Sequence, residues 1–198
     1  MQVPPPSPVA ILGAGSWGTA LGVLARRAGR EGTIWVRDRE VLAASNRDRR
    51  SPFLPELEPP GGIRASDDFE ATVGSADVIL LVTPSRTVRE ICSRIAEHKT
   101  VSAPVVLCAK GIEAGTGLLM SEVAAQVLPE TPVGALSGPT FAREAAAGDY
   151  TAATVAFPFA YADRLHPEAS PAARLAVTFG SDTFRPYVSD ALIGVEVG

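Results

Sequence analysis

One stretch near the N-terminus constrains this chain more than any other, because it joins an apolar run to a glycine-rich corner and a helical pattern. It reads V-A-I-L-G-A-G-S-W-G-T-A-L-G, and Val9 to Leu12 have the continuous apolar character of a central strand in a parallel sheet. Three glycines follow in the spacing G-x-G-x-x-G, namely Gly13, Gly15 and Gly18. Thr19 to Ala28 then continue at helical period, so the stretch predicts a strand, a tight turn and a helix.

Each glycine of this corner has a physical role in a dinucleotide site. Gly13 allows the tight turn, Gly15 lets the backbone approach a diphosphate, and Gly18 lets the helix pack closely on the strand. The diphosphate then lies on the free N–H groups and the positive dipole end of the helix. Glycine spacing alone also occurs in plain strand–turn–helix corners. The strand before it and the helix after it favour dinucleotide binding.

The rest of the chain alternates between strand and helix patterns. Strands are expected at 33–36, 63–65, 76–82, 104–108, 132–136, 151–157 and 183–187. Helices are expected at 39–45, 68–73, 86–97, 118–128, 141–147 and 160–177, and a proline-rich loop at 46–62 that is functional or mobile. This alternation predicts an α/β fold with a doubly wound, mostly parallel Rossmann-type sheet and helices on both faces.

Length and composition limit the domain organisation and the class of partner. The 198 residues suffice for one well-buried domain, which we place at 9–189, after a disordered proline-rich tail at 1–8. The formal net charge of -4 gives no reason to expect nucleic acid or an anionic membrane as partner. The N-terminus has no signal-peptide pattern and no apolar run could span a bilayer, so we expect a cytoplasmic protein. Cys92 and Cys108 lack metal or redox spacing and are expected to be buried thiols, and no metal site is expected.

The end of the second expected strand carries the residue that distinguishes the two nicotinamide cofactors in this fold. An acidic residue there favours NAD, whereas an arginine can accommodate the 2′-phosphate of NADP. Arg37 occupies the strand end and Asp38 follows it. The pair therefore leans towards NADPH, with NADH also accepted. The structural alternative is an exposed Arg–Asp pair at a helix start.

Lys110 follows a buried strand directly, so its ammonium group is expected to project into the ligand crevice. In a doubly wound sheet, ligands bind beyond the carboxyl ends of the strands. A desolvated lysine there can polarise a carbonyl group or hold a phosphate. The alternative is a solvated lysine on a connection, and position alone does not decide between the two. Two further strand ends carry polar groups, at Thr83–Ser85 and Ser137–Thr140.

Several motifs in the same order resemble the NAD(P)-dependent glycerol-3-phosphate dehydrogenases. They are G-A-G-S-W-G-T-A-L at 13–21, V-T-P-S at 82–85, C-A-K-G-I-E at 108–113, L-S-G-P-T-F-A-R-E at 136–144 and D-A-L-I-G-V-E-V-G at 190–198. Together they cover nearly the whole chain, and K-G-I-E combined with S-G-P-T-F is specific to this family.

The resemblance implies hydride exchange between a nicotinamide and the central carbon of dihydroxyacetone phosphate, giving sn-glycerol 3-phosphate for phospholipid synthesis. It implies a small-molecule substrate and a homodimer in the full-length enzyme. It also implies roles for seven residues. Ser16 and Trp17 lie at the cofactor diphosphate, Arg37 lies at the adenosine end of the cofactor, and Ala142 lies against the cofactor. Lys110 lies where cofactor and substrate meet, and Gly138 and Thr140 line the glycerol phosphate site.

The chain also departs from the family pattern. Where the family has P-T-A after the S-G-P-T-F helix, this chain reads D-Y-T-A at 149–152. The family continues past the equivalent of Gly198 into G-A-x-K-N, whose lysine is the general acid/base, and then into a helical domain that binds the substrate phosphate. We therefore expect 190–198 to start a helix leading to that domain, and the 198 residues to bind cofactor with little turnover. The alternatives are a non-catalytic dinucleotide-binding module and a related dehydrogenase of another hydroxy acid.

Overall fold

The computed structural model describes residues 8–28, 30–57, 64–98, 103–149, 151–156 and 184–189, and in the last two segments only the backbone and the side chain of Ala153. The strands are β1 Val9–Leu12, β2 Gly32–Trp35, β3 Arg64–Ser66, β4 Val78–Leu81, β5 Val105–Leu107, β6 Val133–Ser137, β7 Thr151–Ala156 and β8 Phe184–Ser189. The helices are α1 Ser16–Arg27, α2 Arg39–Asp48, α3 Phe69–Gly74, α4 Val88–Glu97, α5 Met120–Val127 and α6 Ala142–Ala147, with a 3₁₀ turn at Ser85–Thr87. The expected tail up to residue 7, the helix at 160–177 and the helix start at 190–198 lie outside the described residues.

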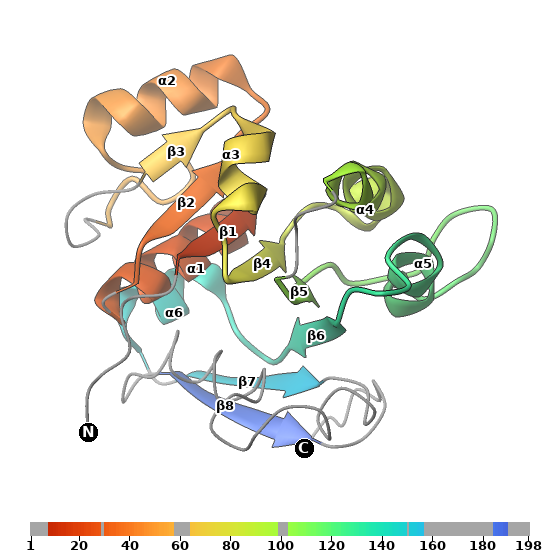
Figure 1. Ribbon diagram of the computed structural model, residues 1–198. Coiled ribbons are helices and arrows are strands. Elements are labelled where there is room, and N and C mark those ends of the chain that lie inside the picture. Colours follow the sequence, from red (N-terminus) through yellow and green to blue (C-terminus); the bar gives the residue numbers. More distant parts are fainter. Residues whose placement is uncertain are drawn as a thin grey trace, which may run out of the picture.

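The described strands form one sheet in the order β3-β2-β1-β4-β5-β6-β7-β8 (Figure 1). The strands from β1 to β6 all pair in parallel. Their order, 3-2-1-4-5-6, is that of the doubly wound Rossmann fold, in which the chain reverses its direction of winding beside β1. The predicted fold class is therefore confirmed.

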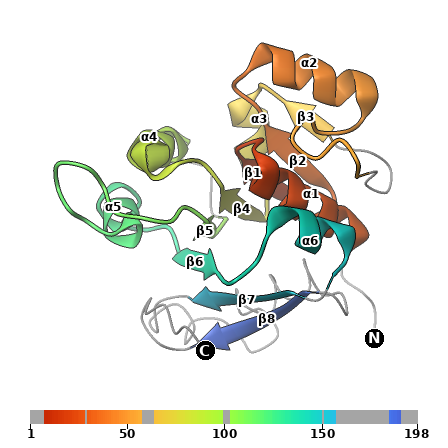
Figure 2. The ribbon, with the colours of Figure 1, turned by 180° about the vertical axis from the view of Figure 1, so that it is seen from behind.

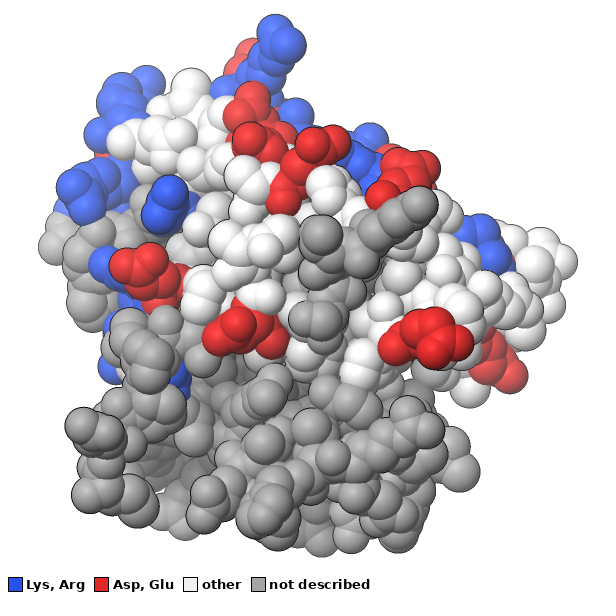
Figure 3. All heavy atoms as spheres, in the orientation of Figure 1, with Lys and Arg blue, Asp and Glu red and all other residues white. Residues whose placement is uncertain are grey.

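Alternate side chains of each inner strand serve opposite faces of the sheet. In β1, Ala10 and Leu12 join the core beneath α3, α4 and α5, whereas Val9 and Ile11 join the core beneath α1 and α6. Figures 1 and 2 show these two helical layers on either side of the sheet. Acidic and basic side chains are intermixed on the described surface seen in Figure 3. Burial on both faces explains why the inner strands read as continuous apolar runs.

The strand after β6 reverses direction, which the alternation of the sequence did not predict. β6 and β7 pair antiparallel, while β7 and β8 pair in parallel. A six-residue α6 rises about 9 Å, whereas the five residues of β6 span about 16 Å, so α6 is too short to return the chain to the far end of β6. Gly148, with a φ of 97°, ends α6 in a left-handed conformation and turns the chain back.

The stretch expected as a loop at 46–62 is partly helical and partly packed. Helix α2 extends to Asp48, three residues beyond the expected end at 45. The Thr19 hydroxyl donates a buried hydrogen bond of 2.8 Å to the Ser51 hydroxyl, and Leu54 is buried against α1 and α6. Arg143 of α6 forms an ion pair of 2.9 Å with Glu56. Residues 51–57 are therefore held on the outer face of α1, and 58–63 lie outside the described residues.

Two glycines of the corner are required by close backbone packing. Gly13 has a φ of 128°, and a Cβ atom there would lie 2.7 Å from the Val82 carbonyl oxygen. A Cβ atom on Gly18 would lie 1.9 Å from the Gly13 carbonyl oxygen. Backbone atoms cannot move aside as a flexible side chain can, so these two positions fix how closely α1 approaches the ends of β1 and β4.

Replacing Gly18 by alanine is expected to lower the free energy of unfolding by about 3 kcal/mol, the upper end of the usual cost of overpacking. Urea denaturation of both proteins measures the difference. Gly74→Ala is the matched control, because a Cβ atom at Gly74 meets nothing within 4 Å. A Gly18→Ala protein as stable as the wild type would contradict the close approach of α1.

Candidate dinucleotide-binding site

Gly15, the remaining glycine of the corner, faces open space. A Cβ atom on Gly15 meets nothing within 4 Å, and its φ of -67° suits any residue. Neither backbone conformation nor internal packing therefore requires a glycine here. The remaining reason for a glycine is access, because a bare backbone leaves room for a ligand to approach the N–H groups that follow.

Helix α1 begins at Ser16 with its first N–H groups free of side-chain partners. Its N-cap is Gly15, no side chain caps it, and its first turn has no acidic residue. Helices α2 and α3, by contrast, are capped by the carboxylates of Asp38 and Asp68. An uncapped helix of this length keeps its positive dipole end and its unpaired donors available to an anion.

A crevice of about 410 Å³ lies in front of this helix end. Residues from the ends of β1, β4 and β5 line it, namely Gly13, Ala14, Gly15, Trp17, Val82, Thr83, Pro84, Ser85, Cys108, Ala109 and Lys110. Parallel strands bring their carboxyl ends to one edge of the sheet, which explains why three segments far apart in sequence meet here. Ser16 is exposed at the start of α1 and Trp17 is half-buried beside it.

Lys110 lines the crevice as the sequence predicts, but it is exposed. Its side chain is therefore in contact with solvent among the described residues, and not desolvated as the sequence analysis considered. Its ammonium group can still approach an anion or a carbonyl oxygen in the crevice as a mobile point charge.

Thr83, which belongs to one of the polar strand ends noted in the sequence, also lines the crevice. Its hydroxyl oxygen is buried and has no hydrogen-bond partner among the described residues. Unpaired buried hydroxyls are uncommon, because each costs about 1–3 kcal/mol relative to a paired one. This orphan group on the crevice wall fits a site built to receive a polar ligand.

The segment that follows Lys110 is tied to α4. Arg89 forms a bidentate pair with Glu113, at 2.7 Å from Nε to Oε1 and 2.8 Å from Nη2 to Oε2. The Thr116 hydroxyl donates to Oε2 of the same carboxylate at 2.7 Å. These hydrogen bonds lower the pKa of Glu113 to about 2, the pair with Arg89 contributing most. The loop after β5 is thereby tied to α4.

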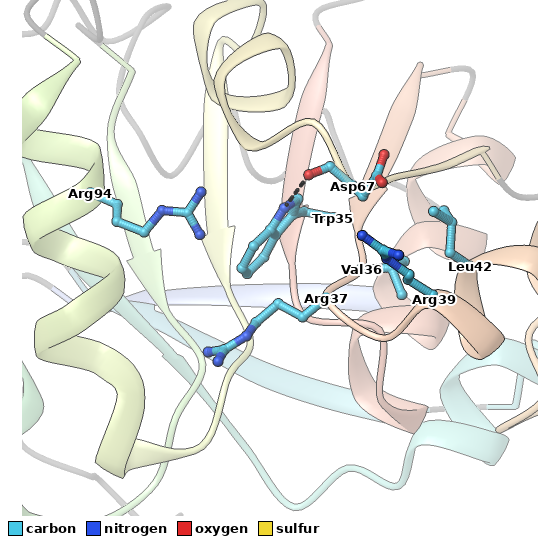
Figure 4. Close-up of a pocket in the computed structure, with 7 residues that line it drawn as sticks. All are labelled: Trp35, Val36, Arg37, Arg39, Leu42, Asp67 and Arg94. Atoms are coloured by element: carbon cyan, nitrogen blue, oxygen red, sulfur yellow. Dashed lines mark hydrogen bonds between the residues drawn. The ribbon is translucent and has the colours of Figure 1, made fainter.

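A second pocket, of about 320 Å³, lies beyond the end of β2 (Figure 4). It is lined by Trp35, Val36, Arg37, Arg39, Leu42, Asp67 and Arg94. The Trp35 indole N–H donates to the Asp67 carbonyl oxygen at 3.1 Å, and the Arg94 guanidinium lies 5.0 Å from the Trp35 ring centre. Arg39 and Arg94 are pocket residues that the sequence analysis did not identify, because the first begins a helix and the second comes from a distant one.

The side chains of Arg37 and Asp38 have different partners in the structure. Asp38 accepts hydrogen bonds from the Glu40 and Val41 N–H groups at 2.8 Å and 3.1 Å, so its carboxylate caps α2. Arg37 lines the pocket and forms an ion pair with Glu90 of α4 at 3.3 Å. Only the arginine of the pair is therefore directed to the pocket.

The remaining predicted residues lie at and after the end of β6. Gly138 and Thr140 follow this strand but line neither pocket. Ala142 begins α6 and packs partly against the cluster that also contacts Trp17. The structure thus brings Ala142 close to the start of α1, whereas it leaves Gly138 and Thr140 apart from the crevice lining.

The two cysteines are buried, as expected. Burial raises the pKa of Cys92 to about 11 and that of Cys108 to about 12, so both thiols stay protonated at neutral pH. No group of three or more His, Cys, Asp or Glu side chains in the described segments could hold a metal ion. None of the described helices has the length and hydropathy of a membrane-spanning segment.

The fold and the two pockets define an α/β domain of the dinucleotide-binding class. A family model described as NAD-dependent glycerol-3-phosphate dehydrogenase N-terminus matches residues 8–161. The chain belongs to this family, which confirms the resemblance found in the sequence.

Individual relatives agree with this assignment. A glycerol-3-phosphate dehydrogenase (NAD(P)+) of Rhodospirillum rubrum is 43% identical over 191 residues, which cover 96% of this chain and 52% of the relative. The protein of the same name from Brucella ovis is 44% identical, covering 96% of this chain and 56% of that one. The crystal structure of glycerol-3-phosphate dehydrogenase from Coxiella burnetii superimposes with a TM-score of 0.84 at 30% identity, covering 96% of this chain and 56% of that chain. The chain therefore spans about half the length of the relatives it matches.

The Arg89–Glu113 pair predicts a specific dependence of stability on pH. A carboxyl group with a lowered pKa stabilises the folded state above its ordinary pKa, and this stabilisation is lost as pH falls. With a folded pKa of about 2, the loss begins near pH 5 and is complete below pH 2. The free energies of unfolding of wild type and Glu113→Gln should therefore differ at pH 7 and converge from pH 5 to pH 2.

Urea denaturation at a series of pH values measures this convergence. Glu97→Gln is the control, since Glu97 is an exposed acid at the end of α4. A difference between wild type and Glu113→Gln that stays constant down to pH 2 would contradict the lowered pKa.

Proposed function

We propose that this chain is the cofactor-binding part of an NAD(P)-dependent sn-glycerol-3-phosphate dehydrogenase. The observation that carries the proposal is the uncapped N-terminus of α1, which opens onto a crevice with Lys110 on its wall. The names of the relatives support the same cofactor and the same substrate. The bound nicotinamide supplies or accepts the hydride that interconverts dihydroxyacetone phosphate and sn-glycerol 3-phosphate.

The residues of this chain bind and orient the reactants. The N–H groups of Ser16 and Trp17 hold the cofactor diphosphate, because they lie at the positive end of α1. Arg37 lies at the adenosine end, in the pocket beyond β2, and Ala142 packs beside the start of α1. Thr83 supplies a hydroxyl for a polar group of the cofactor.

Lys110 is the residue of this chain that acts nearest to the chemistry. Its ammonium group can hold the oxygen on the reacting carbon and so favour negative charge there. Gly138 and Thr140 bind the glycerol phosphate, a role that rests on the family resemblance. A homodimer of the full-length enzyme and a role in phospholipid synthesis are inferred from the same resemblance, whereas a cytoplasmic location is proposed from the sequence pattern alone.

Binding of NADH tests the cofactor site directly. We expect Gly15→Val to abolish binding measurable by calorimetry, because its side chain occupies the open space that the diphosphate needs. Folding should persist, since the space around Gly15 is free and its φ is ordinary. Gly74→Val is the matched control, a glycine-to-valine change at an equally open position in α3. Equal NADH affinity of wild type and Gly15→Val would rule out a diphosphate at the corner.

The second test concerns turnover. A polypeptide of residues 1–198 is expected to bind NADPH without measurably oxidising it in the presence of dihydroxyacetone phosphate. The reason is that the lysine implied as general acid/base lies outside these residues, and losing such a group costs about 10²- to 10⁴-fold in rate. A polypeptide extended through that lysine and the helical domain should be active, and Lys110→Ala should inactivate it. Robust turnover by residues 1–198 would show that the proton donor lies within them.

A further inference from the structure

Arg37 forms an ion pair with an acidic residue of another element. Its Nη1 atom lies 3.3 Å from Oε1 of Glu90, and the two side chains are 57% and 53% exposed. Arg37 follows β2 and Glu90 belongs to α4, so the pair bridges elements far apart in sequence. Figure 4 shows Arg37 extending toward the helix that carries Arg94, away from Arg39.

The other charged groups around Arg37 leave Glu90 as the acid that competes for it. Asp38 is adjacent in sequence, but its carboxylate caps α2. Asp67 lines the same pocket, but Figure 4 shows its carboxylate on the side of Arg39, away from the guanidinium of Arg37. Arg94 lies 3.9 Å from the centre of the Phe69 ring and is stacked there. Among the described residues, the carboxylate of Glu90 is thus the group that a second anion has to replace at Arg37.

We propose that Glu90 is a cofactor-specificity residue that competes with the 2′-phosphate of NADP(H) for the guanidinium of Arg37. The inference rests on the proposed function, in which Arg37 lies at the adenosine end of the cofactor. A carboxylate and a phosphate bind the same fork of N–H donors, so both cannot use it fully at once. NADH has no 2′-phosphate and does not enter this competition. Glu90 therefore lowers the preference for NADPH over NADH.

The size of the effect follows from the exposure of the pair. Exposed ion pairs are weak, so releasing Arg37 from Glu90 should raise the ratio of NADPH to NADH affinity by about twofold to fivefold. Both charges are in contact with solvent, so added salt screens the competition as well. The gain should therefore be largest at low ionic strength and decrease towards 1 M salt.

The experiment compares wild type with Glu90→Gln, which keeps the side-chain shape and removes its charge. Calorimetry at low salt measures the affinities for NADPH and NADH, and the ratio is expected to rise by about twofold to fivefold in the variant. Glu97→Gln is the matched control. It removes the same charge from the same helix about two turns away, about 10 Å along its axis, and should leave the ratio unchanged.

A double-mutant cycle shows whether Glu90 acts through Arg37. In an Arg37→Gln background, Glu90→Gln should no longer change the ratio. If Glu90→Gln raised the ratio of NADPH to NADH affinity as much in the Arg37→Gln background as in the wild type, the proposal would be overturned, because Glu90 would then repel the phosphate directly. If the protein binds each cofactor but Glu90→Gln leaves the ratio of NADPH to NADH affinity unchanged, this inference alone is overturned. If the wild type bound neither NADH nor NADPH, the proposed function would fail, and the inference with it.

Discussion

The contact between the backbone of Gly18 and the carbonyl group of Gly13 sets the geometry of the site. It holds the first turn of α1 against the end of β1 at a distance that no side chain permits. Gly13 makes a similar contact with Val82, at the end of β4. These contacts between backbones place the free N–H groups of α1 beside the ends of β4 and β5. The crevice exists because the helix and three strand ends converge there.

The sheet can present this edge to ligands because its stability comes from elsewhere. The inner strands are only three to five residues long, yet their alternate side chains fill two separate cores. Helices on both faces bury these apolar groups, and most members of both cores come from the strands and helices themselves. Polar and glycine residues can therefore occupy the strand ends, and the orphan hydroxyl of Thr83 is tolerated there.

The partners of the acidic side chains determine which positive groups remain available to a ligand in the two pockets. Asp38 and Asp68 cap α2 and α3, and Glu113 is held by Arg89. The start of α1 has no such partner, and its positive end stays available to an anion. Around the second pocket, Arg37 is shared with Glu90, so an anion that reaches it has to compete. The two pockets therefore offer an anion different electrostatic conditions, an uncapped helix end in one and a guanidinium shared with a carboxylate in the other.

The sequence by itself determined the glycine corner, the succession along the chain of the first six strands with their helices, and the position of Lys110 at a strand end. These features depend on local periodicity and on the conformational freedom of glycine, which neighbouring residues encode. The tertiary structure decided the reversal at β7, the packing of 51–57 on α1, the exposure of Lys110 and the partners of Asp38 and Arg37. Each of these depends on helix length or on a contact between segments far apart in the chain, and local pattern carries no information about such contacts.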